Sequence, residues 1–420
     1  MTDAPGSNWA GTHDYAARGV LTPGSAQEIA DAVRSGVRLK ALGSRHSFND
    51  IADSSGDLVS LERLAGDPAI DASRQRVTVP AGLRFAELAV HLESEGLALH
   101  NLGSLPHISV AGAVATGTHG SGRYNGNLSS AVSGVQFVSG SGELVTVERG
   151  DTDFDGVVVS LGALGIVTAV TLDVQPTYQV QQDIYLDLPW DAVLGEFDAI
   201  MSSAYSVSLF TDWTGSTLKQ AWVKTRLDAQ PQLPPSFFGA RPAGEAVMSP
   251  AGDDLDNTTV QGGVPGPWFE RLPHFRADVT PSAGDEIQTE YFVDAAVAVE
   301  AIQAVRALAD RIAPVLLVTE LRTIAADRLW LSPAYARNSL AIHFTWFNRP
   351  DQVRELLPVI EQALAPFAPR PHWGKWFSLR AEQIAPQYER FEEFRALAER
   401  LDPPRRFRNA YLERVLELPD

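Results

Sequence analysis

Ala41-Leu-Gly-Ser-Arg-His-Ser47 is the stretch that decides the fold, together with Ser104-Leu-Pro-His-Ile-Ser-Val-Ala-Gly-Ala-Val-Ala-Thr-Gly-Thr-His-Gly-Ser-Gly122 further along the chain. The first stretch ends the apolar run 37–42, so it predicts a strand that leads into a tight loop with its backbone N–H groups turned outward. A loop of this kind suits a pyrophosphate, because successive N–H groups attract negative charge.

The second stretch is rich in glycine. Gly112, Gly117, Gly120 and Gly122 carry no Cβ, so the backbone there can approach a large planar ligand closely. Each stretch alone is a weak signal, but the two together indicate a flavin site. The chain has no Gly-x-Gly-x-x-Gly motif, which disfavours a dinucleotide-binding Rossmann domain.

The composition limits the class of protein. With 420 residues the chain is long enough for two large domains, and 45% hydrophobic residues with 33 glycines and 27 prolines are typical of a globular protein with many loops. Its 52 acidic and 34 basic residues give a formal charge of −18, which repels nucleic acids and anionic membranes. The absence of cysteine excludes disulfides, thiolate zinc sites, iron–sulfur clusters and cysteinyl-flavin links.

The first residues lack the basic and apolar regions of an export signal, and no run approaches the ~18 apolar residues of a membrane-spanning helix. We therefore expect a cytoplasmic protein with no membrane and no nucleic-acid partner. The chain has no His-Glu-x-x-His or other spaced ligand set, so we predict no metal site. We expect His107 and His119, which lie in the glycine-rich stretch, to order loops.

Capping signals and periodicity predict an α+β fold. Ser25-Ala-Gln-Glu28 is a capping box that opens a helix with Ile29 and Val33 on one face. Two apolar runs separated by Ser-Gly-Ser-Gly predict a hairpin over 135–147. The other predicted strands are 165–174, 286–293, 315–323 and 339–347, and the other predicted helices are 295–309, 351–365 and 387–401. We place a domain boundary near Pro176, because the pattern changes after it and a loop-rich stretch, 230–267, follows.

Polar residues alternate along two of the predicted strands. Residues two apart point to the same face of a sheet, so Glu320 lies beside Arg322, and His343 lies beside Thr345. Gln288, with Glu286 and Glu290 on its face, extends this surface on a third strand. A carboxylate, a guanidinium, an imidazole and a hydroxyl on one face suit a ligand with adjacent hydroxyl groups.

Each of these residues also has a structural interpretation. In the structural interpretation, Glu320 and Arg322 form a half-exposed ion pair and His343 is a hydrogen-bonded core histidine. Lys375, in His372-Trp-Gly-Lys375, is then a solvated surface lysine, and His46 caps its own loop. Residue pattern alone does not decide between the structural and the functional interpretation.

The chain resembles the flavoproteins of the vanillyl-alcohol oxidase type, and within them the alditol and xylitol oxidase branch. The resemblance covers nearly the whole chain. The two glycine-rich stretches are shared by the wider family, whereas Glu320-Leu-Arg322, His343-Phe-Thr345 and His372-Trp-Gly-Lys375 are similar to the polyol branch. The chain departs from that branch at Gly103, where the branch has alanine.

The resemblance implies a two-domain α+β flavoprotein. An FAD-binding domain, 1–176, is followed by a substrate (cap) domain of sheet and helices, 177–374, and by a C-terminal segment, 375–420, that returns to the FAD domain. It also implies that FAD is bound covalently through His46. The residues implied to contact FAD are Ala41, Leu42, Gly43, Ser44, Arg45, His46, Ser47, Gly103, Ser104, Ser109, Gly112, Ala113, Val114, Ala115, Thr116, Gly117, Gly165, Ile166, His372 and Lys375.

The same resemblance implies the reaction: a polyol gives a hydride to flavin N5, an aldose forms, and O2 is reduced to H2O2. Catalytic roles fall to Glu320, Arg322, His343 and Lys375, with His343 as acceptor of the hydroxyl proton and Lys375 near the N1–C2=O edge of the flavin. The residues implied to bind substrate are Ser104, Gln288, Glu320, Arg322, Thr345 and Lys375. We expect a monomer whose partners are a polyol and O2. The alternatives are an aldonolactone oxidase or dehydrogenase of the same fold, and a carbohydrate-binding or flavin-carrying module without turnover.

Overall fold

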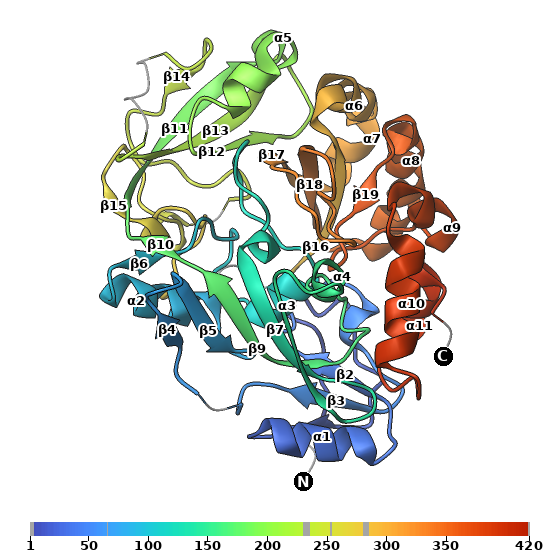
Figure 1. Ribbon diagram of the computed structural model, residues 1–420. Helices are drawn as coiled ribbons and strands as arrows, with labels where there is room; N and C mark the ends of the chain where they lie inside the picture. Colours follow the sequence, from blue (N-terminus) through green and yellow to red (C-terminus); the bar gives the residue numbers. More distant parts are fainter. Residues whose placement is uncertain (1–3, 65, 230–235, 253, 280–284, 419–420) are drawn as a thin grey trace.

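The computed structural model describes residues 4–64, 66–229, 236–252, 254–279 and 285–418 (Figure 1). The chain begins with a small parallel sheet, in the order β1-β3-β2, formed by Val20–Leu21, Asp57–Ser60 and Leu39–Leu42. Helix α1, Ala26–Arg34, begins where the capping box predicts it, because the Ser25 hydroxyl accepts a hydrogen bond from the Glu28 N–H at 3.2 Å. Strand β2 begins two residues later than predicted and leads directly into the loop 43–47.

A second sheet, in the order β4-β5-β9-β7-β8, completes the first half of the chain. The predicted hairpin is present as β7, Val132–Val138, and β8, Leu144–Glu148, and the predicted strand after it is β9, Ile166–Asp173. Strands β4 and β5 span Ala69–Asp71 and Arg76–Pro80, and the pair β6 and β10 spans Leu97–Ala98 and Gln175–Pro176. Helices α2, α3 and α4 span Phe85–Ser94, Val110–Ala115 and Phe154–Val157.

The second half of the chain forms a large antiparallel sheet, in the order β14-β11-β13-β12-β17-β18-β16-β19, with β15 on β11 (Figure 1). Its central strands match the sequence predictions: β16 spans Glu286–Asp294, β17 spans Leu316–Ile324 and β18 spans Ser339–Phe347. The other strands are β11, β12, β13, β14, β15 and β19, which span Gln179–Pro189, Ser206–Thr211, Thr217–Arg226, Arg241–Pro242, Gly266–Pro267 and Arg370–Pro371.

Helices cover one face of the large sheet and leave the other face toward the first half of the chain (Figure 1). The covering helices α5, α6, α7 and α8 span Trp190–Met201, Ala298–Arg306, Ala309–Ile312 and Pro350–Leu364. The predicted helix 295–309 is thus divided, with a 3-10 turn at Ala295–Val297 where the Asp294 side chain accepts from the Ala296 N–H. The predicted loop-rich stretch 230–267 lies partly outside the described residues.

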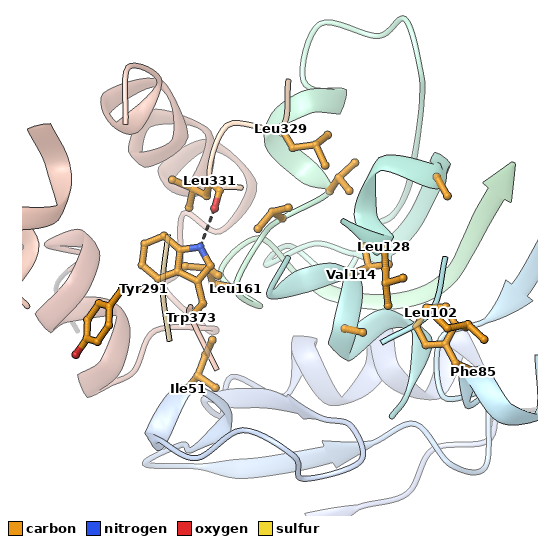
Figure 2. Packing of buried hydrophobic residues seen from close by; sticks show 14 of the residues in the cluster. Ile51, Phe85, Leu102, Val114, Leu128, Leu161, Tyr291, Leu329, Leu331 and Trp373 are labelled. Carbon is orange, nitrogen blue, oxygen red and sulfur yellow. Dashed lines mark hydrogen bonds between the residues drawn. The ribbon is translucent and has the colours of Figure 1, made fainter. Parts of the chain in front are cut away.

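The last segment packs against the first half. Its helices α9, α10 and α11 span Ala381–Ile384, Phe391–Leu401 and Ala410–Leu416, so α10 begins later than the predicted 387 because Ala385–Gln387 is a 3-10 turn that contains Pro386. Figure 2 shows how Trp373, fully buried, enters the core beside Ile51 and Tyr291 and donates its indole N–H to the Leu331 carbonyl at 2.7 Å.

We keep 1–176, 177–374 and 375–420 as the proposed division into domains. Strand β10 pairs with β6 in the first half, and β11 is already part of the large sheet. Among the described residues, no helix is long and apolar enough to cross a membrane.

Candidate functional site

A cavity of about 350 Å3 lies between the first half of the chain and the open face of the large sheet. Its walls are formed by the stretches 41–47 and 103–119 and by polar residues of β16, β17 and β18, so residues far apart in sequence meet there. The predicted site residues that line it are Ala41, Leu42, Gly43, Ser44, Arg45, His46, Ser47, Gly103, Ser104, Ser109, Gly112, Ala113, Ala115, Thr116, Gly165, Gln288, Glu320, Arg322, His343, Thr345, His372 and Lys375.

Three predicted cofactor residues do not line the cavity. Val114 lies on the side of α3 that faces the hydrophobic core, and Ile166 is fully buried in that core. A Cβ at Gly117 would meet the Pro333 ring at 2.9 Å, so this glycine permits close packing of the chain. Alternation explains the case of Ile166, because Gly165 and Val167 on either side of it line the cavity.

The loop 43–47 presents unpaired backbone donors to the cavity. Among the described residues, the N–H groups of Ser44, Arg45, His46 and Ser47 meet no acceptor, although all four residues line the cavity. Arg45 adopts a positive φ of 62°, and its guanidinium donates to the Ser7 carbonyl at 3.2 Å. A turn of this kind makes a concave set of donors for an anion, so it fits a pyrophosphate.

The two glycine-rich stretches are joined at this loop. The Ser44 hydroxyl accepts from the Ser109 N–H at 3.1 Å. A Cβ at Gly43 would lie 2.5 Å from the Ser109 hydroxyl oxygen, and one at Gly112 would lie 2.7 Å from it. A side chain at either glycine would therefore require the Ser109 hydroxyl to move.

His46 is held by the N-terminal segment. Its ring stacks on Trp9 at 5.2 Å and an interplanar angle of 18°, and its Nδ1 donates to the Ser44 carbonyl at 2.8 Å. The Trp9 N–H donates to the Arg45 carbonyl at 2.8 Å. Burial lowers the pKa of His46 to about 4, so the imidazole is neutral at physiological pH and can act as a nucleophile.

The polar residues of the large sheet form one row across three strands. His343 on β18 pairs with Glu290 on β16 and with Glu320 on β17, and Thr345 pairs with Gln288. Residues that face one another in this register share one side of the sheet, and all five line the cavity. The predicted alternation of polar residues therefore delivers them to a single surface.

Arg322 lies next to this row and carries the positive charge between its two carboxylates. Arg322 donates to the Glu290 carboxylate at 2.9 Å and lies 3.6 Å from the Glu320 carboxylate, while His119 contacts Glu290 at 3.0 Å. Burial opposes ionisation of Glu290, but His119 and Arg322 hold its pKa well below the usual range. For Glu320, Arg322 and His274 likewise outweigh burial and lower its pKa. Both carboxylates are therefore ionised acceptors, and Arg322 is a buried cation shared between them.

Gln288 connects His343 with Lys375. Its side-chain oxygen accepts from the Lys375 ammonium and lies 3.2 Å from His343 Nε2. Burial, then the positive charge of Lys375, lowers the pKa of His343 to about 3, and burial lowers the pKa of Lys375 to about 8. His343 is therefore neutral at pH 7, and because Gln288 takes the Nε2 hydrogen, Nδ1 is the nitrogen that can accept a proton.

Two residues of this site were missed by the sequence analysis. His274 lies in the loop after residue 270 and donates to the Glu320 carboxylate at 2.7 Å, and Lys224 on β13 lies 3.2 Å from the other ring nitrogen of His274. Neither residue belongs to a motif or to a polar alternation in the sequence. Lys224 lies two strands from Glu320 in the same sheet, with β12 between β13 and β17, and His274 on its loop bridges the two residues.

His119, Glu290 and His372 are close enough to one another to suggest a metal site. Their ligand atoms lie within 4.8 Å of one another, and all three side chains are buried. However, Glu290 is already compensated by Arg322 and His119, and His372 Nδ1 accepts from the Gly374 N–H at 3.1 Å. A cation here would compete with Arg322 for the same carboxylate, so the arrangement favours a hydrogen-bonded network.

Comparison with known proteins agrees with this geometry. Residues 17–148 match the FAD binding domain family, and residues 285–415 match the D-arabinono-1,4-lactone oxidase family. The chain is 46% identical over 414 residues to alditol oxidase of a Streptomyces species. This match covers 98% of this chain and 99% of that protein. It is 29% identical over 432 residues to L-gulono-1,4-lactone dehydrogenase of Mycobacterium tuberculosis, with 98% of each chain covered.

Among solved structures, cholesterol oxidase of Brevibacterium sterolicum has the same fold. The TM-score is 0.78 at 15% sequence identity, and the match covers 98% of this chain and 96% of that chain. At this identity the likeness concerns the fold alone.

Proposed function

This chain belongs to the alditol oxidase family of FAD-dependent oxidoreductases, and on that premise we propose that it oxidises the terminal hydroxyl of alditols such as xylitol and sorbitol to the aldose. The observation that carries the proposal is the row of Glu320, His343, Thr345 and Gln288, which opens onto the same cavity as the donor loop 43–47. Acceptors and donors spaced along three strands match the adjacent hydroxyl groups of an extended polyol.

In the proposed reaction, Glu320 and Arg322 bind the hydroxyl groups of the polyol. The ionised carboxylate accepts hydrogen bonds and the guanidinium donates them, so together they fix the position of the carbon chain. His343 accepts the proton of the hydroxyl that is oxidised, because its imidazole is neutral and Nδ1 is free to accept. The loop 43–47 and the glycine-rich stretch would hold FAD, which would supply the two-electron chemistry: uptake of the hydride, and its transfer with protons to O2 to give H2O2.

Ser104 and Thr345 add hydroxyl groups to the substrate surface. The Ser104 hydroxyl accepts from Arg322 at 3.2 Å, so it lies where the cofactor loops meet the large sheet. Lys375 contributes a buried positive charge that stabilises the negative charge arriving with the hydride. Gln288 holds this ammonium through its side-chain oxygen.

We propose further that FAD is attached covalently through His46, because the ring is neutral, lines the cavity and is fixed by Trp9 and Ser44. Acid precipitation of the native protein should leave the yellow colour in the pellet, and His46→Ala should release it to the supernatant. Quantitative release of flavin from the native protein would contradict the attachment without affecting the proposed reaction. The matched control is His91→Ala, which changes an imidazole outside the cavity and should keep the colour in the pellet.

The second candidate is oxidation of an aldonolactone, which the match of residues 285–415 to the D-arabinono-1,4-lactone oxidase family favours. Purified protein should be tested with xylitol, sorbitol and galactono-lactone under air, with H2O2 as the readout. We expect peroxide with the two polyols and little with the lactone. Peroxide with the lactone alone would replace the proposal by the second candidate. The proposal also includes a cytoplasmic monomer whose partners are the polyol and O2.

A further inference from the structure

We propose that Lys224 and His274 are positioning residues that hold the carboxylate of Glu320 in the orientation needed to accept the hydroxyl groups of the substrate. The inference deepens the proposed function and rests on it for the role of Glu320. The three side chains form a chain of contacts, ammonium to imidazole to carboxylate, that begins on β13 and ends on β17 at the wall of the cavity.

The hydrogen bonds of Lys224 fix the tautomer of His274. The ammonium lies 2.6 Å from the Leu272 carbonyl, 2.9 Å from the Pro273 carbonyl and 3.2 Å from His274 Nδ1. Three hydrogens thus meet three acceptors, and Nδ1 must accept. The remaining nitrogen of a neutral ring, Nε2, then carries the hydrogen, and it lies 2.7 Å from the Glu320 carboxylate oxygen.

The two oxygens of Glu320 have different partners. Oε1 accepts from His274, and Oε2 lies 3.6 Å from the Nε atom of Arg322. Oε1 can accept a second hydrogen bond, and Oε2 forms an ion pair but no hydrogen bond with Arg322 Nε, so the carboxylate still presents acceptors to the cavity. Without His274 the carboxylate is free to rotate about its last bond toward Arg322 alone.

Aromatic walls fix the plane of the imidazole. The His274 ring lies edge to face with Trp222 at 4.8 Å and lies 5.8 Å from Phe210. The backbone N–H groups of His274 and Phe275 both donate to the Ser104 carbonyl, at 3.1 and 3.2 Å. One loop therefore locates both Glu320 and Ser104, the two groups proposed to contact substrate from opposite walls.

The burial of Lys224 argues that it serves more than packing. The residue is 1% exposed, and an apolar side chain would fill the same space without the cost of burying an ammonium. Burial lowers the pKa of Lys224 to about 7, so at pH 6 the ammonium predominates and all three hydrogens are present. Glu320 and Arg322 are the charged groups that act on it.

A double-mutant cycle tests the inference with the FAD-loaded protein at pH 6. His274→Leu should lower kcat/KM for xylitol at least tenfold. His274→Gln, which keeps an N–H donor toward Glu320, should lower it less than threefold. In a Glu320→Gln background, His274→Leu should lower it less than threefold further, because the group that His274 positions is already altered. Thermal unfolding and bound flavin are measured for every variant.

Equal losses in the two backgrounds would overturn the inference, because His274 would then act independently of Glu320. Equal losses for His274→Leu and His274→Gln would overturn it too. The tautomer is checked without turnover by 15N spectra of histidine-labelled protein, with His274→Gln to identify the signal. We expect the Nε2–H tautomer of His274 in the wild type and a mixture of both tautomers in Lys224→Met. An Nδ1–H tautomer in the wild type would refute the proposed positioning of Glu320 by Lys224 and His274. Absence of peroxide from the wild type contradicts the proposed function and leaves this spectroscopic test intact.

Discussion

Replacing Glu320 by glutamine tests the centre of the proposed substrate site. Glutamine keeps the size of the side chain but removes the charge and places an amide N–H2 where one carboxylate oxygen stood. Both oxygens of Glu320 face donors, His274 at 2.7 Å and Arg322 at 3.6 Å, so the new amide group must face one of them donor to donor. Arg322 keeps Glu290 at 2.9 Å, and the protein should still fold.

The expected loss follows from one charge-assisted hydrogen bond to the substrate. Such a bond contributes about 1.5–3 kcal/mol, which corresponds to roughly a 10- to 160-fold lower kcat/KM. The loss should appear in flavin reduction by xylitol, because substrate contacts act before oxygen does.

Stopped-flow absorbance under anaerobic conditions measures flavin reduction, and peroxide release gives kcat/KM. The control is Glu361→Gln, which makes the same change in a carboxylate that is 5% exposed, like Glu320, and accepts from the Tyr291 hydroxyl at 2.8 Å outside the cavity. That variant should lose thermal stability and keep kcat/KM. A change of less than threefold in Glu320→Gln would refute direct contact between Glu320 and the substrate.

Three further predictions address the cofactor and the buried histidines. Lys375→Met should slow flavin reduction and weaken sulfite binding. Burial lowers the pKa of Lys375 to about 8, so kcat/KM of the wild type should fall as pH rises through 8. The variant should show no such fall. Gly103→Val should slow reoxidation of the flavin by O2 far more than its reduction by polyol. A Cβ at Gly103 meets only ordinary contacts at 3.7 Å or more, so the valine side chain would fit and would extend into the cavity. Equal slowing of both half-reactions in stopped-flow experiments would assign Gly103 to backbone geometry alone. The midpoint of thermal unfolding should fall as pH drops from about 6.5 toward 3. Burial lowers the pKa values of His343 and His372 from 6.5 to about 3, so in this range the unfolded chain binds protons that the folded chain does not bind. A midpoint that stays constant between pH 7 and 4 would contradict this.

Alternation along the strands made part of the site predictable. The bounds of β18 agree with the sequence prediction, and the register of β16, β17 and β18 places Gln288, Glu320 and His343 on one face as a period of two requires. The donor loop at 43–47 was predictable for a similar local reason, because the strand that precedes it ends where the apolar run ends.

The other contacts of the site join segments that are far apart in sequence, so local pattern does not predict them. His274 contacts Glu320 although the two residues are 46 positions apart in sequence, so no local pattern predicts this contact. The pairing of His119 with Glu290 likewise joins the glycine-rich stretch to β16. Val114 and Ile166, which the motifs assigned to the cofactor, belong to the hydrophobic core and do not line the cavity.

The closure of the donor loop by the end of the chain has a consequence for biosynthesis. The Asn49 side chain donates to the carbonyls of Trp373 and Lys375, the Phe48 N–H donates to Gly374, and Arg414 on α11 pairs with Asp50 at 2.6 Å. The residues beside His46 therefore acquire these neighbours only after the chain has been synthesised through residue 414. We therefore expect cofactor capture to follow the synthesis of residues 373–414, and nascent chains stopped before residue 373 should be colourless.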